Sequence, residues 1–428
     1  MRSWTRRRFG ATARAAALLA GGPALAAGTQ PYAGMTLNLA SMNDPFATVL
    51  VKLAPEFEAA TGVTVKVDVL SYPELLTKVT ADFIGNTKGY DLVTTDNVWS
   101  GQFAEAGHTV VLNDWIKRDS AELQLDDIYP VVMSSLGNYQ GKQVAFPFAG
   151  YANVLAMRKD LYAAAGLEAP ATMEAMIADA RKLTDKPKNV YGWVANGQKG
   201  PAVAQDWMQY NAQLGGSILG PDGKPAINTP ANVASLVVYK KLFDETAPPG
   251  AVDYDWGGRE ESFRQGLAAN MQTWSVGASA YDNPEQSKVA GKVAIVLAPP
   301  GEHAAKNYGV GGWGLGINAD IDADHKAAAW EFIKWIASPA VQKKMAELGG
   351  GGVIRKSTTH DPDLLKKYPF MTVIDVSFSN GNGEYRPRIP QYPQIQDILG
   401  TAVNAVLAGG ADPQTALDDA QKKAMKLF

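Results

Sequence analysis

Residues 146–167, FPFAGYANVLAMRKDLYAAAGL, constrain the fold of this chain more than any other stretch. Residues 146–150 contain Pro and Gly and predict a bend, and the apolar run 151–157 can cross a sheet. Residues 158–165 have the composition of a short helix, which Gly166 would end in the C-cap position. A chain that leaves one lobe through a strand and then builds a second lobe needs such a segment. An ordinary strand–helix unit within one large domain would look the same, so this stretch leaves both architectures open.

Strands and helices alternate through the N-terminal part of the chain. Residues 35–40 and 63–70 have the apolar–polar alternation of strands, and residues 90–94 form a short apolar run typical of a buried strand. Residues 46–61 between them have helical spacing, with Gly62 as a stop signal. Such alternation predicts an α/β fold with a mainly parallel sheet. A mature chain of roughly 400 residues is long enough for two or three domain-sized lobes.

Polar and aromatic residues follow three of these predicted strands. Open α/β sheets bind their ligands beyond the carboxyl ends of the strands, so these loops are candidates for a binding site. The same residue types also favour turns and helix caps for backbone reasons alone, and that alternative stays open. The candidates in these loops are Asn43, Asp44, Tyr72, Asp96 and Trp99.

The N-terminus has the features of an export signal. Residues 5–9, TRRRF, approximate the twin-arginine pattern, and Ala24-Leu25-Ala26 is a small-residue cleavage site. A general secretory signal with a basic start is the alternative. We expect residues 1–26 to be removed, leaving a soluble periplasmic protein with no further membrane-spanning stretch. Loss of the five leader arginines would lower the net charge from −3 to about −8, which disfavours nucleic acid or an anionic membrane as a partner.

Several kinds of chemistry lack the residues that they need. The chain has no Cys, and its four His show no HExxH or other metal-ligand spacing, so neither a zinc site nor a His-based nucleophile is expected. Residues 309–314 match G-x-G-x-x-G, but a strand-like segment follows instead of the helix that a dinucleotide site requires. Residues 320–324 carry alternating acids, yet His325 replaces the glycine of a calcium loop, which favours helix capping. We therefore expect no metal and no cofactor.

Aromatic residues are frequent in the predicted loops. A Trp ring offers a flat apolar face to a sugar, and its N–H can donate to a hydroxyl. The alternative for each ring is a place in the core, because ten Trp cannot all face a ligand. Besides Tyr72 and Trp99, the aromatic candidates are Tyr151, Trp207, Trp256, Trp274 and Trp313.

Three blocks of the sequence resemble the family 1 extracellular solute-binding proteins, the sugar-binding subunits of ABC importers, which are maltose-binding-protein-like. They are PFAGYANVLAMRKDLYAAAGLEAPATMEAM, GGWGLGINADIDADHKAAAWEFIKWIASPAVQKKMAELGGGGVIRKS and QYPQIQDILGTAVNAVLAGGADPQTALDDAQKKA. The blocks keep the family order and span most of the mature chain. The resemblance implies a loop at Gly312 and Trp313 that enters an interlobe strand. It also implies a binding role for Arg355, although Val353 and Ile354 stand where the family motif has Pro.

The resemblance implies a periplasmic-binding-protein type of α/β fold, with two lobes, each with a mainly parallel sheet, joined by hinge strands. The lobes would be residues 34–147 with 279–337, and residues 148–278 with 338–428. It further implies a monomeric ABC-importer subunit, not an enzyme, that closes on a carbohydrate or polyol and delivers it to the permease membrane subunits.

Two alternatives stay open. A periplasmic glycoside hydrolase would need two carboxylates facing one cleft, for which Asp44, Asp96 and Asp282 are candidates. A binder of a peptide, an iron chelate or another anion would show an excess of Arg in the cleft.

Overall fold

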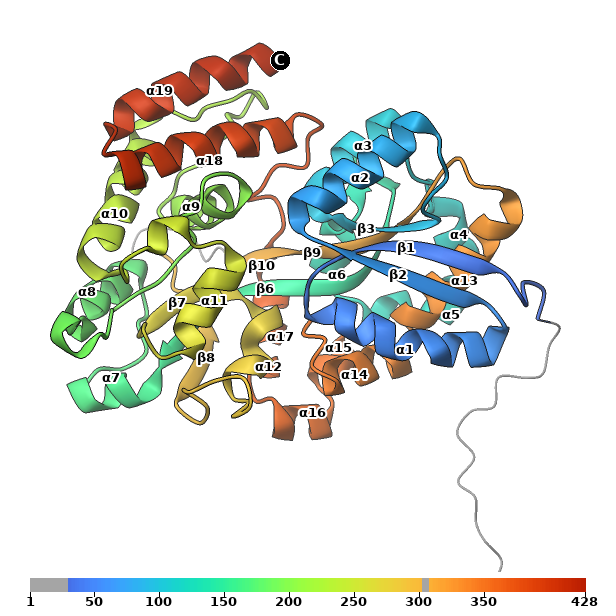
Figure 1. Cartoon of the computed structure of the whole chain (residues 1–428), viewed down its shortest axis with the longest axis horizontal. Helices are drawn as coiled ribbons and strands as arrows, with labels where there is room; N and C mark the ends of the chain where they lie inside the picture. Colours follow the sequence, from blue (N-terminus) through green and yellow to red (C-terminus); the bar gives the residue numbers. More distant parts are fainter. Residues whose placement is uncertain (1–29, 302–307) are drawn as a thin grey trace, which may run out of the picture.

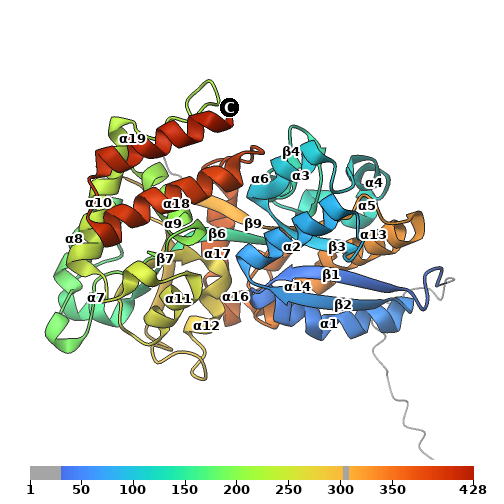
Figure 2. The same cartoon turned by 45° about the horizontal axis from the view of Figure 1, so that its top comes forward.

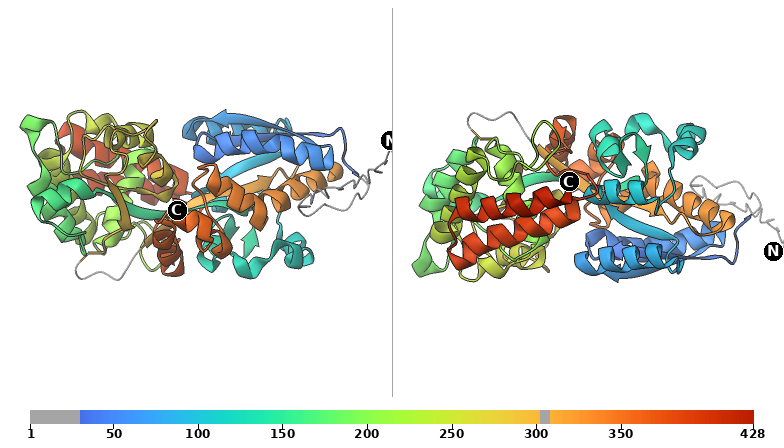
Figure 3. Two further views of the ribbon diagram at one scale, coloured as in Figure 1. Left: turned by 90° about the horizontal axis from the view of Figure 1, so that it is seen from below. Right: turned by 90° about the horizontal axis from the view of Figure 1, so that it is seen from above.

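The computed structural model describes residues 30–301 and 308–428, so the predicted leader lies outside the described residues. Two bodies stand side by side, and two long strands run from one to the other (Figures 1 and 2). These strands are β6 (Phe146–Arg158) and β9 (Tyr308–Ile317), and every residue in both is buried. Views from below and above show the same separation into two bodies (Figure 3). Within the described ranges, no helix is both long and apolar enough to cross a membrane.

The first body is built on the alternating segment that the sequence predicts. β1 (Thr36–Met42) pairs in parallel with β2 (Thr64–Leu70) and with β3 (Leu92–Asp96). The connecting helices are α1 (Pro45–Thr61) and α2 (Tyr72–Gly85). This arrangement puts the carboxyl ends of the three strands at one edge, where the predicted candidate loops lie.

Local signals set the ends of both helices. Gly62 follows α1 with φ 75°, a left-handed conformation that glycine adopts without strain. A capping box of Ser71 and Glu74 starts α2, and in it the Glu74 carboxylate accepts from the Ser71 backbone N–H at 3.1 Å.

β9 and β6 extend this sheet into the second body. The strand order is β2-β1-β3-β9-β6-β7, and β9 lies antiparallel to both β3 and β6. The far half of β6 pairs with β7 (Asn270–Trp274) and β8 (Val293–Leu297), while β10 (Gly381–Asn382) pairs with β9. The mixed α/β class is therefore confirmed, with parallel pairs in the first body and antiparallel pairs along the connecting strands.

Two expectations for these strands are wrong. Residues 146–150 were expected to bend, but they belong to β6, and only a register shift between Pro147 and Ala149 marks the site of the proline. Proline donates no ladder hydrogen bond, so an irregularity of the bulge type accommodates it. Gly312 and Trp313 lie within β9, not in a loop before it. A Cβ on Gly312, whose φ is 130°, would lie 2.2 Å from the backbone oxygen of Ala149, so glycine allows the two strands to approach closely here.

Helices cover the second body. Residues 191–195 make isolated bridges to the segment around β7, Tyr191 with Ala268 and Val194 with Met271. α18 (Tyr392–Gly409) and α19 (Pro413–Ala424) pack over α9 (Pro201–Gln213) and α10 (Pro230–Thr246) (Figure 1). The remaining helices of this body are α7 (Lys159–Ala165), α8 (Met173–Leu183), α11 (Trp256–Arg264) and α12 (Ala278–Tyr281).

Further elements complete the chain. Near the first body they are α3 (Ser100–Ala106), α4 (Asn113–Arg118), α5 (Ser120–Leu123), α6 (Pro130–Ser135), β4 (Asn138–Tyr139), β5 (Lys142–Gln143), α13 (Ala323–Ala337) and α14 (Pro339–Glu347). α15 (Lys356–Thr359), α16 (Pro362–Lys367) and α17 (Met371–Ser379) follow. The Asp322 side chain caps α13 by accepting from the His325 backbone N–H at 2.9 Å, as predicted.

Candidate functional site

A cavity of about 320 Å³ lies where the two bodies meet. Its walls come from the ends of β1 and β3, the start of α2 and the middle of β9 on one side, and from α9, α11, the end of β7 and the segment before α18 on the other. The predicted residues on its walls are Asn43, Asp44, Tyr72, Asp96, Tyr151, Trp256, Trp274, Gly312 and Trp313.

Aromatic rings form a connected group around this cavity. The Tyr72 ring lies 5.4 Å from that of Trp256 and 6.1 Å from that of Trp313, between centroids. Trp99 is fully buried behind them, with its centroid 5.1 Å from Tyr72 and 5.6 Å from Trp313. Its expected place on the ligand wall is therefore corrected: Trp99 supports two rings that line the cavity.

Trp207 and Arg355 also lie away from the cavity. Trp207 is fully buried in α9 as part of the core. The Arg355 guanidinium is fully buried too, and it donates to the backbone oxygens of Ala337 at 2.6 Å and Leu123 at 2.7 Å. Arg355 therefore has a structural role, and it directly follows Val353 and Ile354, which stand where the family motif has Pro.

Asp96 ends β3 in a hydrogen-bonded position. The Tyr72 hydroxyl donates to its Oδ2 at 2.9 Å, and Arg386 Nη1 lies 3.6 Å from the same oxygen. Arg386 also donates from Nη2 to Asn97 Oδ1 at 2.8 Å, and its guanidinium carbon lies 5.3 Å from the Trp274 ring centroid. This geometry combines an ion pair with a cation–π contact.

Arg386 lies in a loop beside Pro387, yet only 2% of it is exposed. The segment before α18 folds back over β9, where glycine gives it room. A Cβ on Gly311 would lie 2.6 Å from Arg386 Nη2 and 2.9 Å from the Trp274 ring. Nothing in the local sequence around Pro387 signals this burial.

Asp44 stands at the N-terminus of α1 but does not cap it. Its Oδ2 instead accepts from the Tyr151 hydroxyl at 2.9 Å. Burial raises the pKa of the Asp44 carboxyl to about 7; the hydrogen bonds from Tyr151 and Trp313 oppose this rise, and the nearby carboxylates of Glu260 and Asp96 add to it.

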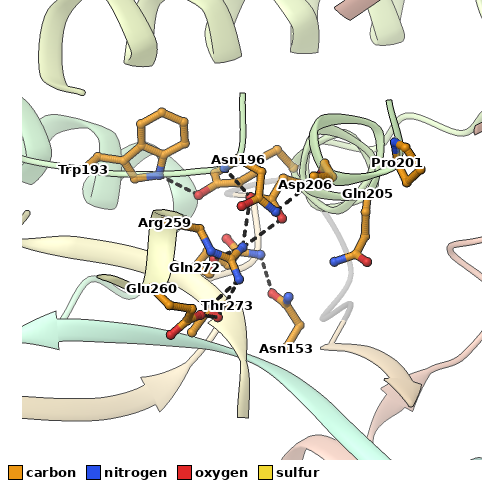
Figure 4. Close-up of polar contacts among 12 residues, drawn as sticks. Asn153, Trp193, Asn196, Pro201, Gln205, Asp206, Arg259, Glu260, Gln272 and Thr273 are labelled. Carbon is orange, nitrogen blue, oxygen red and sulfur yellow. Dashed lines mark hydrogen bonds and ion pairs between the residues drawn. The ribbon is translucent and has the colours of Figure 1, made fainter. Parts of the chain in front are cut away.

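A polar network supports the second-body wall (Figure 4). Arg259 Nη1 donates to both carboxylate oxygens of Asp206 at 3.0 Å, which ties α11 to α9. Arg259 Nη2 donates to Thr273 Oγ1 at 2.8 Å and to Glu260 Oε1 at 3.1 Å. Burial raises the pKa of the Asp206 carboxyl, and the charge of Arg259 opposes that rise. No motif or spacing in the sequence points to these four residues.

The Gln205 amide also reaches the cavity from α9. With its oxygen turned to the indoles, it accepts from Trp274 Nε1 at 2.6 Å and from Trp256 Nε1 at 3.3 Å. Two predicted rings are thus held by one amide that the sequence did not indicate.

The cavity combines aromatic faces with carboxylates and guanidinium groups. Such a set can stack on a carbon skeleton and can both donate hydrogen bonds to its hydroxyls and accept from them. Asp282, the third candidate for a hydrolase pair, does not line it. Among the residues that the structure describes, no group of three or more His, Cys, Asp or Glu is placed to hold a metal ion.

The family model for the bacterial extracellular solute-binding protein matches residues 40–343. An ABC transporter solute-binding protein from Agrobacterium radiobacter K84, solved with ribitol, is 64% identical; the match covers 93% of this chain and 100% of that one, with a TM-score of 0.91. Another, from Agrobacterium vitis S4 with D-mannitol, is 28% identical, with 92% and 98% covered and a TM-score of 0.83. A probable amino-acid ABC transporter periplasmic-binding protein of Sinorhizobium fredii is 25% identical, with 92% and 89% covered.

These similarities confirm the resemblance inferred from the three sequence blocks and the periplasmic-binding-protein type of fold. Because the family model matches more than half of its length, the chain belongs to the bacterial extracellular solute-binding protein family.

Proposed function

We propose that this protein is the periplasmic substrate-binding component of an ABC importer and that its solute is an acyclic polyol of the pentitol or hexitol class. The observation that carries this is the cavity between the two bodies, where aromatic rings surround the Asp96–Arg386 pair. The 64% identical relative was solved with ribitol and a more distant one with D-mannitol, which supports the choice of a polyol over a cyclic sugar.

The size of the cavity supports a small solute. About 320 Å³ lies at the lower end of the roughly 300–1,000 Å³ that is usual for small-molecule sites. A polyol places a hydroxyl on every carbon, and each hydroxyl both donates and accepts. Asp96 accepts and Arg386 donates side by side, so one pair of neighbouring hydroxyls can satisfy both.

Transport would follow from closure of two lobes around the solute. The strands β6 and β9 would be the hinge, and the solute would select the closed state through contacts on both sides. The lobes would be residues 34–147 with 279–337 and residues 148–278 with 338–428, as the resemblance implies, except for two elements that change lobe. β8 would join the second lobe, because it pairs with β6 beside β7. α14 would join the first, because Lys344 donates to Glu56 of α1 at 2.5 Å.

The closed monomer would dock on the permease membrane subunits after export, for which the twin-arginine route is our proposal. No catalysed reaction is part of this proposal.

Isothermal titration calorimetry on the mature protein, refolded to remove any retained solute, tests the proposal. The panel holds ribitol, D-mannitol, cyclic monosaccharides, a disaccharide and amino acids. We expect one site with micromolar or tighter affinity for a polyol, and recovery of the polyol chemically unchanged. Tighter binding of an amino acid or a cyclic sugar, or release of a product, would refute the proposed solute class.

A further inference from the structure

We propose that Asp44 sets the charge specificity of the cavity: it accepts a solute group that donates hydrogen bonds, a hydroxyl or a protonated amine, and it excludes carboxylates. The inference rests on the proposed function, because it assumes that a polyol-like solute occupies this cavity. It adds amino polyols, which carry a protonated amine, to the solutes that the cavity can take.

The first observation is the position of the Asp44 side chain. Asp is among the best N-cap residues, and a cap bond contributes about 1 kcal/mol to helix stability. Asp44 begins the long helix α1 without making that bond. Its carboxylate turns to Tyr151 and the cavity instead. Local helix chemistry does not explain this orientation, whereas a role in the cavity does.

The second observation is that the other lining carboxylates have cationic neighbours and Asp44 has none. Glu260 lies 3.1 Å from Arg259, and Asp96 lies 3.6 Å from Arg386. Within the described part of the chain, no Lys, Arg or His nitrogen lies within 4.0 Å of the Asp44 carboxylate. Its hydrogen bonds come from the neutral donors of Tyr151 and Trp313. A solute group that faces Asp44 therefore meets an unpaired carboxylate.

The third observation is the charge balance behind the walls. Arg259 is shared, because it binds Asp206 at 3.0 Å as well as Glu260. Arg264, the other lining cation, pairs with Glu261 at 2.8 Å. Once these pairs are matched, the site keeps an excess of negative charge.

A carboxylate entering such a site adds repulsion and displaces no anion. A protonated amine would supply the missing counter-charge, and a hydroxyl would donate one hydrogen bond. The raised pKa of Asp44, about 7, agrees with a carboxyl that lacks a cation.

The test measures affinities at pH 8, above the pKa of Asp44, by calorimetry with four matched ligands: ribitol, 1-amino-1-deoxyribitol, ribonate and ribarate. Ribonate could turn its single carboxylate toward Arg386, so ribarate, with a carboxylate at each end, is the stricter probe. We expect the amino polyol to bind at least as tightly as ribitol, and ribarate at least about tenfold more weakly, on the order of 1.4 kcal/mol.

The Asp44→Asn variant keeps the shape of the side chain and removes its charge. We expect the ribitol-to-ribarate affinity ratio to fall by about tenfold in this variant and the amino polyol to lose its advantage. Asp412→Asn is the matched control: Asp412 is also an N-cap aspartate, at α19, and does not line the cavity. Ratios rather than absolute affinities are compared, so a general loss of binding does not mimic the effect.

Three results separate the two proposals. Ribarate binding within threefold of ribitol, or an unchanged ratio in Asp44→Asn, would overturn the role of Asp44 while the polyol proposal stands. Binding of the acids without any binding of ribitol would overturn both. If none of the four ligands binds, the polyol proposal is refuted, and the proposed role of Asp44 is refuted with it.

Discussion

Replacement of Arg355 by Met separates a structural arginine from a ligand-binding one. The guanidinium is fully buried and donates to the backbone oxygens of Ala337 at 2.6 Å, Leu123 at 2.7 Å and Gln124 at 3.2 Å. It also pairs with Asp127 at 3.2 Å. Met keeps much of the apolar stem but removes every donor, so three carbonyls lose a partner together.

The expected loss of stability follows from these four contacts of Arg355. A buried acceptor left without its donor costs roughly 1–3 kcal/mol, and removal of one partner of a buried ion pair costs about 3–5 kcal/mol. Asp127 keeps two donors from Ser357, at 2.8 Å from the backbone N–H and 2.6 Å from the hydroxyl, and it is partly exposed. The loss therefore comes mainly from the three carbonyls, and we expect Arg355→Met to lower the free energy of unfolding by about 3–5 kcal/mol.

Urea unfolding followed by tryptophan fluorescence measures the loss, and calorimetry below the transition measures ligand affinity. We expect the affinity of folded Arg355→Met to stay within about twofold of the parent, because Arg355 does not line the cavity. Arg181→Met is the matched control: its ion pair with Glu245 is exposed on both sides, so the expected loss is below about 1 kcal/mol. A loss under 1 kcal/mol in Arg355→Met, or a tenfold weaker affinity, would refute this reasoning.

Three further variants test the cavity. Gly312→Ala would place a Cβ 2.2 Å from the Ala149 oxygen, at a residue whose φ is 130°. We expect urea unfolding to show a free energy of unfolding lower by about 1–3 kcal/mol, and parent-like stability would contradict the close approach of the two strands. Trp274→Ala removes a buried ring from the cavity wall and should weaken polyol binding by roughly 30-fold. A change below threefold by calorimetry would show that the Trp274 ring does not contact the solute. Asp44 has a folded-state pKa of about 7, above its unfolded value near 3.8, so the contribution of Asp44 to the stability of the parent should fall as the pH rises from about 4 to 7. Asp44→Asn removes this dependence and should gain up to ~4 kcal/mol over the parent at pH 8 but little at pH 4; an equal difference at both pH values would contradict the raised pKa.

The sequence predicts those parts of the fold that depend on neighbours along the chain. Gly62 and Gly166 end their helices in left-handed conformations, and Ser71 and Glu74 form the capping box, because a helix end needs partners only a few residues away. Residues 146–150 gave a wrong prediction for the opposite reason. Their Pro and Gly suggest a bend, but pairing with β9, more than 150 residues later, holds them in a strand.

The same distinction divides the site. Asp44, Tyr72 and Asp96 could be predicted to lie together, as they do on the cavity wall, because strand ends in a parallel sheet meet at one edge, a rule that needs only strand positions. Arg386 was missed because its partner Asn97 lies 289 residues away. Residue type led to wrong predictions in two further cases. Trp207 faces the core, and no pattern in the sequence says whether this face of its helix is turned to the core or to the cavity. Arg355 matched a family motif, yet its bonds go to backbone oxygens.

In the proposed closure, the Asp96–Arg386 contact would link the choice of solute to the closed form. Asp96 ends a strand of the first body, and Arg386 lies on the segment that leads into α18 of the second. Both side chains are buried when they are 3.6 Å apart, so separating the bodies rehydrates two charges and also frees the hydrogen bond to Asn97. Buried ion pairs gain little net free energy, because desolvation offsets their attraction. In the proposed closed form, the pair by itself would therefore contribute little, and a solute that adds donors and acceptors to both partners would supply the difference. Arg386→Lys, which keeps the charge but loses the planar fork, is therefore expected to weaken polyol affinity about tenfold by calorimetry, and unchanged affinity would show that charge alone suffices.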